Sequence, residues 1–236
     1  MTRPARWSRA LWPVAATLLS VGLLAGCGKN VKDEFPLSVG FQPIEAVGPQ
    51  VTWPAASGND LTPQGLGPVV AGPSKGHYTS YARGYLHAPL ARVYLALHDP
   101  RASLIHNQDG HPQLDGAMQP NPAMNEEPFP VSFRVRYFTR ATVNTKFDVT
   151  YRAGPLEGTD AAPTVVGERY QKTWGTEYIS VMAGSLVATA VPGAPDVTSV
   201  EMVAWLNART QYQSNCDGTL RDLFGDLEAV LAALPP

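Results

Sequence analysis

The chain has 236 residues, enough for one medium-sized domain with extensions or at most two small domains. Its 44% apolar and 16% charged residues are typical of a globular protein with a core. The 18 basic residues include Arg3, Arg6 and Arg9, and no acid lies before residue 27, so the remainder carries 15 basic and 20 acidic residues, a net charge of −5. Nucleic acid is therefore not an expected partner, because binding it requires a basic surface.

The amino terminus has the pattern of a secretory signal. The arginines are followed by a mostly apolar run over 10–24, and then by Leu24-Ala25-Gly26-Cys27. This run is interrupted by polar residues and proline, and it is shorter than the roughly 20 apolar residues that span a bilayer. An uncleaved anchor helix and a plain secretory signal are the alternatives.

Leu24-Ala25-Gly26-Cys27 resembles the lipobox of bacterial lipoproteins. The resemblance implies that residues 1–26 are a signal peptide and that Cys27 is lipidated with several acyl chains, palmitate among them. Two or more chains give stable anchoring. We therefore expect a membrane-anchored protein of the cell envelope. Gly28 stands where an inner-membrane retention signal has Asp, which favours the outer membrane, facing the periplasm or the surface.

Residues 27–75 are rich in proline and glycine and show little periodicity, which indicates an extended tether. The folded domain is expected over 76–236. It begins with a strand over 77–87, and Pro89 then opens a helix. Asp99-Pro100 ends this helix, a short second helix is expected within 101–107, and a polar loop over 107–130. The helix carries one apolar stripe: Leu90, Val93, Tyr94 and Leu97.

Alternating apolar and polar residues predict strands over 132–137 and 143–151, which form a hairpin. Further strands are expected over 165–174, 178–191 and 200–206. Asp217 is then predicted to cap a carboxy-terminal amphipathic helix. Its apolar positions are Leu220, Leu223, Phe224, Leu227, Val230, Leu231 and Leu234.

This order of elements resembles the START-like, or helix-grip, superfamily of polyketide cyclase and lipid-transfer-like domains. The resemblance is carried by the segment His87-Ala88-Pro89-Leu90-Ala91-Arg92-Val93-Tyr94-Leu95-Ala96-Leu97-His98-Asp99-Pro100 and by the helix over 217–234. It implies an α+β fold with an antiparallel sheet of about six to seven strands packed on the long last helix. Another antiparallel α+β sheet with a packed helix is the alternative.

In that family the sheet curls around the last helix and leaves a cavity between them, which is apolar as a lipid site requires. A filled core would need the same residues. The inward side chains expected to line an apolar ligand cavity are Phe133, Val135, Tyr137, Phe147, Val149, Tyr151, Val200, Met202, Leu220, Phe224 and Leu227.

Few residues suggest a catalytic or metal-binding role. With Cys27 acylated, Cys216 has no disulfide partner and is interpreted as a buried residue. The loop with His106, His111 and Asp115 is interpreted as solvated rather than as a metal site, and no metal or cofactor is expected. Arg134 and Arg136 are expected to face solvent.

The sequence lacks the common nucleophile, phosphate-binding and dinucleotide motifs. Glu126-Glu127 lies in a loop and does not define an acid–base pair. Glu168, Glu177 and Glu201 lie on strands, and alternation directs Glu201 outward. No catalytic residue is assigned, and the protein is not expected to be an enzyme.

Three functions stay open. The domain binds an apolar small molecule or lipid at the envelope, or it has a filled core and contacts an envelope protein, for example through an exposed patch with Val203 and Trp205. The third is a cyclase- or hydrolase-like enzyme, which would need a polar cluster inside the cavity.

Overall fold

The computed structural model describes residues 65–66, 69–72, 76–103, 129–140, 144–209 and 213–235. These residues form one antiparallel sheet and a few helices. The elements in chain order are β1 (Gly65–Leu66), β2 (Val70–Ala71), β3 (Tyr78–Leu86), α1 (Leu90–Leu97), the 3₁₀ helix η1 (Pro100–Ser103), β4 (Val131–Arg140), β5 (Asn144–Thr159), β6 (Ala162–Gly175), β7 (Ile179–Val191), β8 (Ala194–Ala208) and α2 (Gln213–Ala233).

The sheet is built from hairpins. Strands β4 to β8 follow one another as neighbours, and β3 pairs with β8, giving the order β1-β3-β8-β7-β6-β5-β4, with β2 also paired to β3. The turn between β7 and β8 contains Gly193 at φ +78°, a conformation that glycine adopts at no steric cost. The pairing of β3 with β8 brings the first long strand beside the last, which local sequence patterns do not specify.

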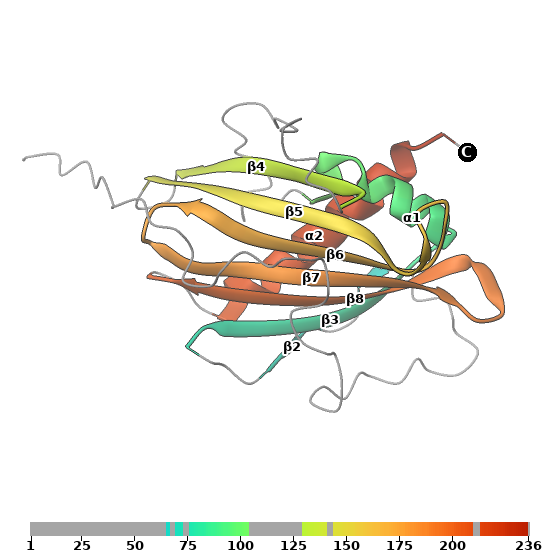
Figure 1. Ribbon diagram of the computed structural model, residues 1–236. Coiled ribbons are helices and arrows are strands. Elements are labelled where there is room, and N and C mark those ends of the chain that lie inside the picture. Colours follow the sequence, from blue (N-terminus) through green and yellow to red (C-terminus); the bar gives the residue numbers. More distant parts are fainter. Residues whose placement is uncertain are drawn as a thin grey trace, which may run out of the picture.

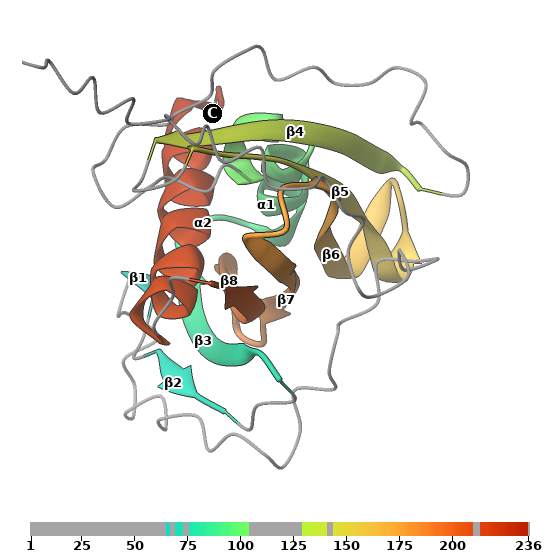
Figure 2. The same ribbon diagram turned by 90° about the vertical axis from the view of Figure 1, so that its left-hand side faces the viewer.

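Both α-helices cover the same face of the sheet (Figures 1 and 2). Figure 2 shows the sheet curving, with β4 near the upper end of α2 and β3 near its lower end in this view. Helix α1 begins directly after Pro89, as the sequence predicts, and buries Leu90, Val93, Tyr94 and Leu97, the predicted stripe. The apolar core lies between the helices and the sheet.

The predicted antiparallel sheet with a carboxy-terminal helix is confirmed. The prediction that Asp217 caps this helix is wrong, because α2 begins one turn earlier, at Gln213. Asp217 lies within the helix, where its carboxylate accepts hydrogen bonds from Ser80 Oγ at 2.6 Å and from Gln213 Nε2 at 3.0 Å. Strands β1 and β2 pair with β3, so the sheet includes residues of the segment expected to be a tether.

Several predictions fall outside the described residues: the signal peptide, the lipidated Cys27, most of the tether, and the loop that holds His106, His111, Asp115 and Glu126-Glu127. Within the described ranges, no helix combines the length and apolarity that crossing a bilayer requires.

Candidate functional site

The inner surface of the sheet is aromatic along β4 and β5. The register pairs Phe133 with Tyr151, Val135 with Val149 and Tyr137 with Phe147, so these side chains share one face. The rings of Phe133 and Tyr151 stack with centroids 5.0 Å apart, and those of Tyr137 and Phe147 at 5.1 Å. This row forms one side of the space between the sheet and α2.

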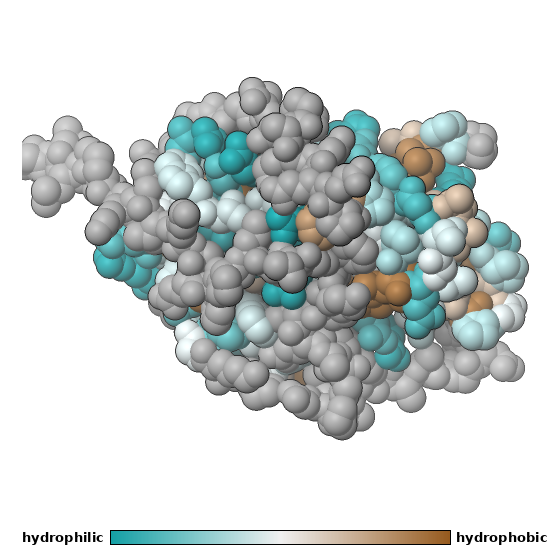
Figure 3. Space-filling model, viewed as in Figure 1, coloured by the Kyte–Doolittle hydropathy of each residue, from teal (hydrophilic) through white to brown (hydrophobic). Residues whose placement is uncertain are grey.

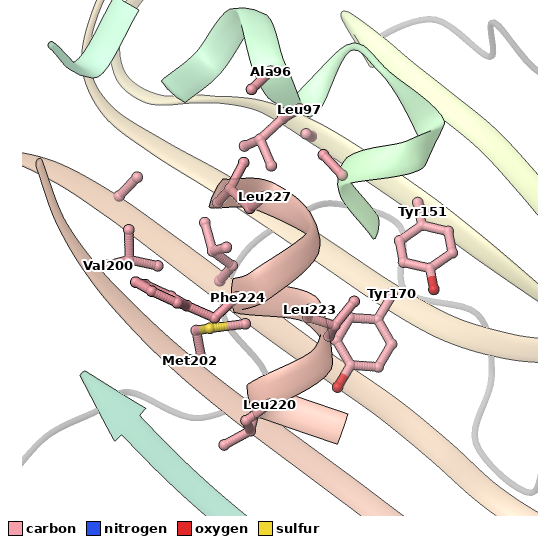
Figure 4. Packing of buried hydrophobic residues seen from close by; sticks show 14 of the residues in the cluster. Ala96, Leu97, Tyr151, Tyr170, Val200, Met202, Leu220, Leu223, Phe224 and Leu227 are labelled. Carbon is pink, nitrogen blue, oxygen red and sulfur yellow. The ribbon is translucent and has the colours of Figure 1, made fainter. Parts of the chain in front are cut away.

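The other side of this interior comes from β8 and α2. Val200 and Met202 lie on the inward face of β8, and Phe224 and its helical neighbours pack towards them (Figure 4). Every residue predicted to line a cavity is at most 4% exposed and belongs to this one cluster. The structure therefore brings these residues together, and their role as the lining of a ligand site stays a prediction.

The interior also contains polar groups on β6. Glu168, Tyr170 and Lys172 occupy alternate positions, and the register pairs them with Ala153, Tyr151 and Val149, which all lie on the inward face. Glu168 is 3% exposed, Tyr170 2% and Lys172 0%. Of these three residues, the sequence suggested only Glu168 as a candidate. The two-residue period of a strand places Tyr170 and Lys172 on the same face as Glu168, and Arg169 and Gln171 on the other face. This pattern could have identified the other two residues.

The tyrosines of the interior are neutral hydrogen-bonding groups. The hydroxyls of Tyr137 and Tyr151 are 2.7 Å apart, and either one can donate. Burial, and then the neighbouring Tyr137, raise the pKa of Tyr151 well above its usual value. Burial raises the pKa of Tyr170 in the same way, with further contributions from nearby Cys216 and Glu168. The phenols therefore keep their protons and act as O–H donors.

Tyr170 has a distinctive position in this cluster. Its ring centroid is 5.8 Å from that of Tyr151, and Figure 4 shows it beside Leu223 of α2. The facing residue on β7 is Gly184, where a Cβ would lie 2.1 Å from the Tyr170 hydroxyl oxygen. Glycine thus leaves the space that the ring occupies. Within the described part of the chain, no hydrogen-bond partner reaches this hydroxyl.

Helix α2 adds two buried titratable groups. Cys216 is fully buried, as interpreted from the sequence, and its thiol donates to the Ala204 carbonyl at 3.4 Å. Burial raises the pKa of Cys216 to about 11, so the thiol is a poor nucleophile at neutral pH. Asp226 is 6% exposed, and burial, followed by repulsion from Asp222, raises its pKa to about 8.

A cleft of about 310 Å³ lies where the start of α1 meets the end of α2. Its lining includes Leu86 and Ala88, which belong to the core, and the charged Arg92 and Glu228. Arg92 Nη2 donates to the carbonyl of Leu231 at 3.4 Å, as well as to a second carbonyl one turn further on. The cleft therefore borders the interior and is bridged by contacts between the two helices.

Other candidates from the sequence lie elsewhere. Glu201 points outward, as predicted, and pairs with Arg83. Glu177 forms an ion pair at the surface at 3.2 Å and does not enter the interior. The patch predicted around Val203 and Trp205 is wrong for Val203, which is only 1% exposed. Its cross-strand neighbours on the same face, Tyr81 of β3 and Ser185 of β7, are buried as well.

Arg134 and Arg136 lie on the outer face of β4 with side chains 42% and 47% exposed, in agreement with the expected orientation. Arg136 binds the Asp148 carboxylate through two hydrogen bonds of 2.7 and 2.8 Å. Figure 3 shows that the described residues visible on this side of the molecule are mostly hydrophilic or neutral. In the described ranges, no group of three or more His, Cys, Asp or Glu residues is arranged to hold a metal ion.

The chain is similar in structure to several solved proteins. The human StarD13 lipid transfer and protein localization domain has 8% sequence identity and a TM-score of 0.44, with 72% of this chain and 90% of that chain covered. The Zhui aromatase/cyclase from a Streptomyces species has 14% identity and a TM-score of 0.40, with coverages of 66% and 93%. A START superfamily protein from Mycobacterium smegmatis has 13% identity and a TM-score of 0.40, with coverages of 68% and 100%.

No protein-family model matches the chain, and no curated protein matches it in sequence. The residues of the interior, and not these similarities, carry the functional argument that follows.

Proposed function

We propose that this protein is a START-like, helix-grip binding module that holds an apolar small molecule or lipid between its sheet and α2. The observation that carries the proposal is the composition of the interior. Its aromatic and aliphatic side chains suit an apolar ligand, and a few convergent polar groups accompany them, which is the usual make-up of a small-molecule site. The long α2 and its apolar face, packed on the curved sheet, are part of this proposal.

The buried polar groups support a binding site over a core that only stabilises the fold. Glu168, Lys172 and the Tyr170 hydroxyl are all buried on the inner face of β6. Burying such groups costs free energy that aliphatic residues of the same volume would not cost. Polar side chains buried in this way are expected in a site where they bind a ligand.

The cleft beside Arg92 supports a route of access, because it borders the core residue Leu86. Movement of the end of α2 away from α1 would widen this cleft by breaking the two hydrogen bonds of Arg92, to the carbonyl of Leu231 in α2 and to that of Leu234 just after it. We propose that a ligand enters and leaves here, at the envelope membrane to which lipidated Cys27 anchors the chain. In the proposal the module is non-enzymatic.

The test is native mass spectrometry with lipid extraction on fragment 28–236, expressed into the periplasm with a cleavable signal. We expect a defined apolar molecule to be released on denaturation. The variant Met202→Ala should change the amount or identity of the bound molecule, and Glu201→Ala, adjacent but on the opposite face, should not. A clean apo mass, with no uptake of added fatty alcohols, fatty acids or phospholipids, would reject the binding function and leave a tethered interaction domain.

A cyclase- or hydrolase-like enzyme is a second candidate, and the inward orientation of Glu168 favours it. A carboxylate beside Tyr151 and Tyr170 could act as a general base, with the phenols as proton donors. The variant Glu168→Gln separates the candidates: it should leave the co-purifying molecule in place if the protein only binds, and it should cause unreacted substrate to accumulate if it catalyses.

A further inference from the structure

Much of the outer face of the sheet, which points away from both helices, is buried (Figures 1 and 2). One row of cross-strand neighbours on this face runs from β3 to β4 through Tyr81, Val203, Ser185, Arg169, Arg152 and Ser132. All of these residues except Arg169 are at most 7% exposed. The next row contains Ala183 and Gln171, which are 3% and 2% exposed. Tyr81, Val203 and Ala183 are buried apolar residues outside the core cluster between the sheet and the helices.

The strands themselves cannot bury this face. Side chains stand roughly perpendicular to a sheet, and neighbouring strands lie about 4.8 Å apart, so one strand does not cover the side chains of the next. An antiparallel sheet with its core on one face commonly exposes the other face to water. Burial of these rows therefore requires a further layer of chain over the outer face.

Described residues lie over the two sides of the face. Next to β2, a Cβ on Gly72 would lie 2.0 Å from the Tyr81 ring, so the backbone of Gly72 passes directly against this ring. Just before β4, the ring centroid of Phe129 is 4.5 Å from the guanidinium carbon of Arg152. The rows on β7 and β8 between these two contacts are buried as well. Two segments lead to these contacts, residues 28–64 through β1 and β2, and residues 104–128 to Phe129.

The sequence of these two segments favours the first as the cover. Phe35, Leu37, Val39 and Phe41 alternate with smaller or polar residues, so an extended chain presents all four on one side. Residues 104–128 have no such alternation and no Phe, Tyr or Trp. Charge does not decide between the segments. Residues 28–64 contain four acids and two bases, residues 104–128 contain four acids and no Lys or Arg, and either excess suits a face rich in arginine.

We propose that residues 28–64 dock on the outer face of the sheet, with the alternating apolar residues of 35–41 against Tyr81, Val203 and Ala183. The length suffices, because the sheet is about 24 Å wide from β3 to β4, a distance that about eight extended residues span. With Cys27 lipidated as proposed above, residues 28–34 alone separate the anchor from the docked part. The domain would then lie within about 25 Å of the membrane surface rather than at the end of a long tether. This docking does not depend on ligand binding.

The experiment measures cysteine accessibility in the full chain, in membrane fragments open on both sides. Ala183→Cys places a thiol under the docked segment, and Thr164→Cys places a reference thiol at an exposed position of β6. The measured quantity is the rate at which each thiol reacts with a membrane-impermeant maleimide, read by mass spectrometry of peptides. The buried Cys216 reports whether the domain is folded in each variant. Ser185→Cys replaces Ala183→Cys if the latter does not fold.

We expect the thiol at position 183 to react at least about tenfold more slowly than the one at position 164. Leu37→Asp combined with Phe41→Asp should accelerate the reaction at 183 about tenfold or more, because burial of each of these side chains is worth about a factor of ten. The matched control is Ser38→Asp combined with Gln42→Asp, which adds the same two charges one position along the chain. It should leave the rate at 183 unchanged.

Three results would overturn the proposal. Rapid labelling at 183 with the segment unchanged would show that the outer face is open. Slow labelling that Leu37→Asp with Phe41→Asp does not accelerate would assign the cover to another part of the chain, and acceleration by Met118→Asp would identify residues 104–128. Equal acceleration by the two pairs of substitutions would show that added charge, and not the loss of apolar contacts, opens the face. The co-purifying apolar molecule, measured on the same variants, tests the binding function separately.

Discussion

Substituting Gly184 by alanine tests the packing of Tyr170 on β7. The added Cβ would lie 2.1 Å from the Cζ and the hydroxyl oxygen of Tyr170 and 2.3 Å from its ring atom Cε1. Non-bonded carbon atoms prefer separations of about 3.5–4.0 Å, so the ring must move by roughly 1.4 Å. Its surroundings are close-packed, with Tyr151 beside it and Leu223 of α2 next to it. Overpacking of this kind typically lowers the free energy of unfolding by about 1–3 kcal/mol.

The assay is thermal and urea unfolding of the single and double variants. For a domain of this size, we expect Gly184→Ala to lower the midpoint temperature by about 2–10 °C. Tyr170→Leu alone should also destabilise, because it leaves a cavity. In the double variant the alanine methyl occupies part of that cavity. The free energy of unfolding should therefore fall by about 0.5–3 kcal/mol less than the sum of the two single losses. Additive losses would refute the contact between Tyr170 and β7.

Three further predictions concern α2. Ser80→Ala removes the 2.6 Å hydrogen bond to Asp217 and should lower the free energy of unfolding by about 1.5–3 kcal/mol. The control is Ser180→Ala, which removes a hydroxyl bond of 3.4 Å and should change this free energy by less than about 0.5 kcal/mol. Equal effects would contradict the anchoring of α2 on β3. Burial raises the pKa of Asp226 to about 8, above its unfolded value of about 4, so the folded state holds a proton that the unfolded state releases. The free energy of unfolding should therefore fall as pH rises from about 4 to about 8. Urea titrations should show a weaker pH dependence of this free energy for Asp226→Asn, and an unchanged dependence would disprove a buried protonated carboxyl. Because burial raises the pKa of Cys216 to about 11, a thiol reagent at pH 7.5 should label this cysteine only after unfolding, and rapid labelling of the native protein would show that α2 detaches from the sheet.

Elements with local signals can be predicted from the sequence. Pro89 and the stripe through Leu97 define α1, and the period-two alternation of β4, β5 and β8 defines these strands and their inward faces. These patterns depend only on neighbouring residues, because 3.6- and 2-residue periods decide which side chains share a face. The sequence does not reveal the start of α2 at Gln213, because Asp217 is a typical cap residue and only the fold shows that its carboxylate accepts from Ser80 and Gln213 instead.

Which inward side chains contact one another follows from the packing of the strands and helices. Alternation shows that Tyr170 and Lys172 share a face with Glu168, but the polar cluster exists only because β6 lies between β5 and β7. The Tyr170 hydroxyl has no hydrogen-bond partner among the described residues, and its position depends on Gly184 across the β6–β7 pair and on Tyr151 across the β5–β6 pair. Strand pairing joins residues far apart in the sequence, and the geometry of a site made from three strands therefore follows from register and packing, which no single segment encodes.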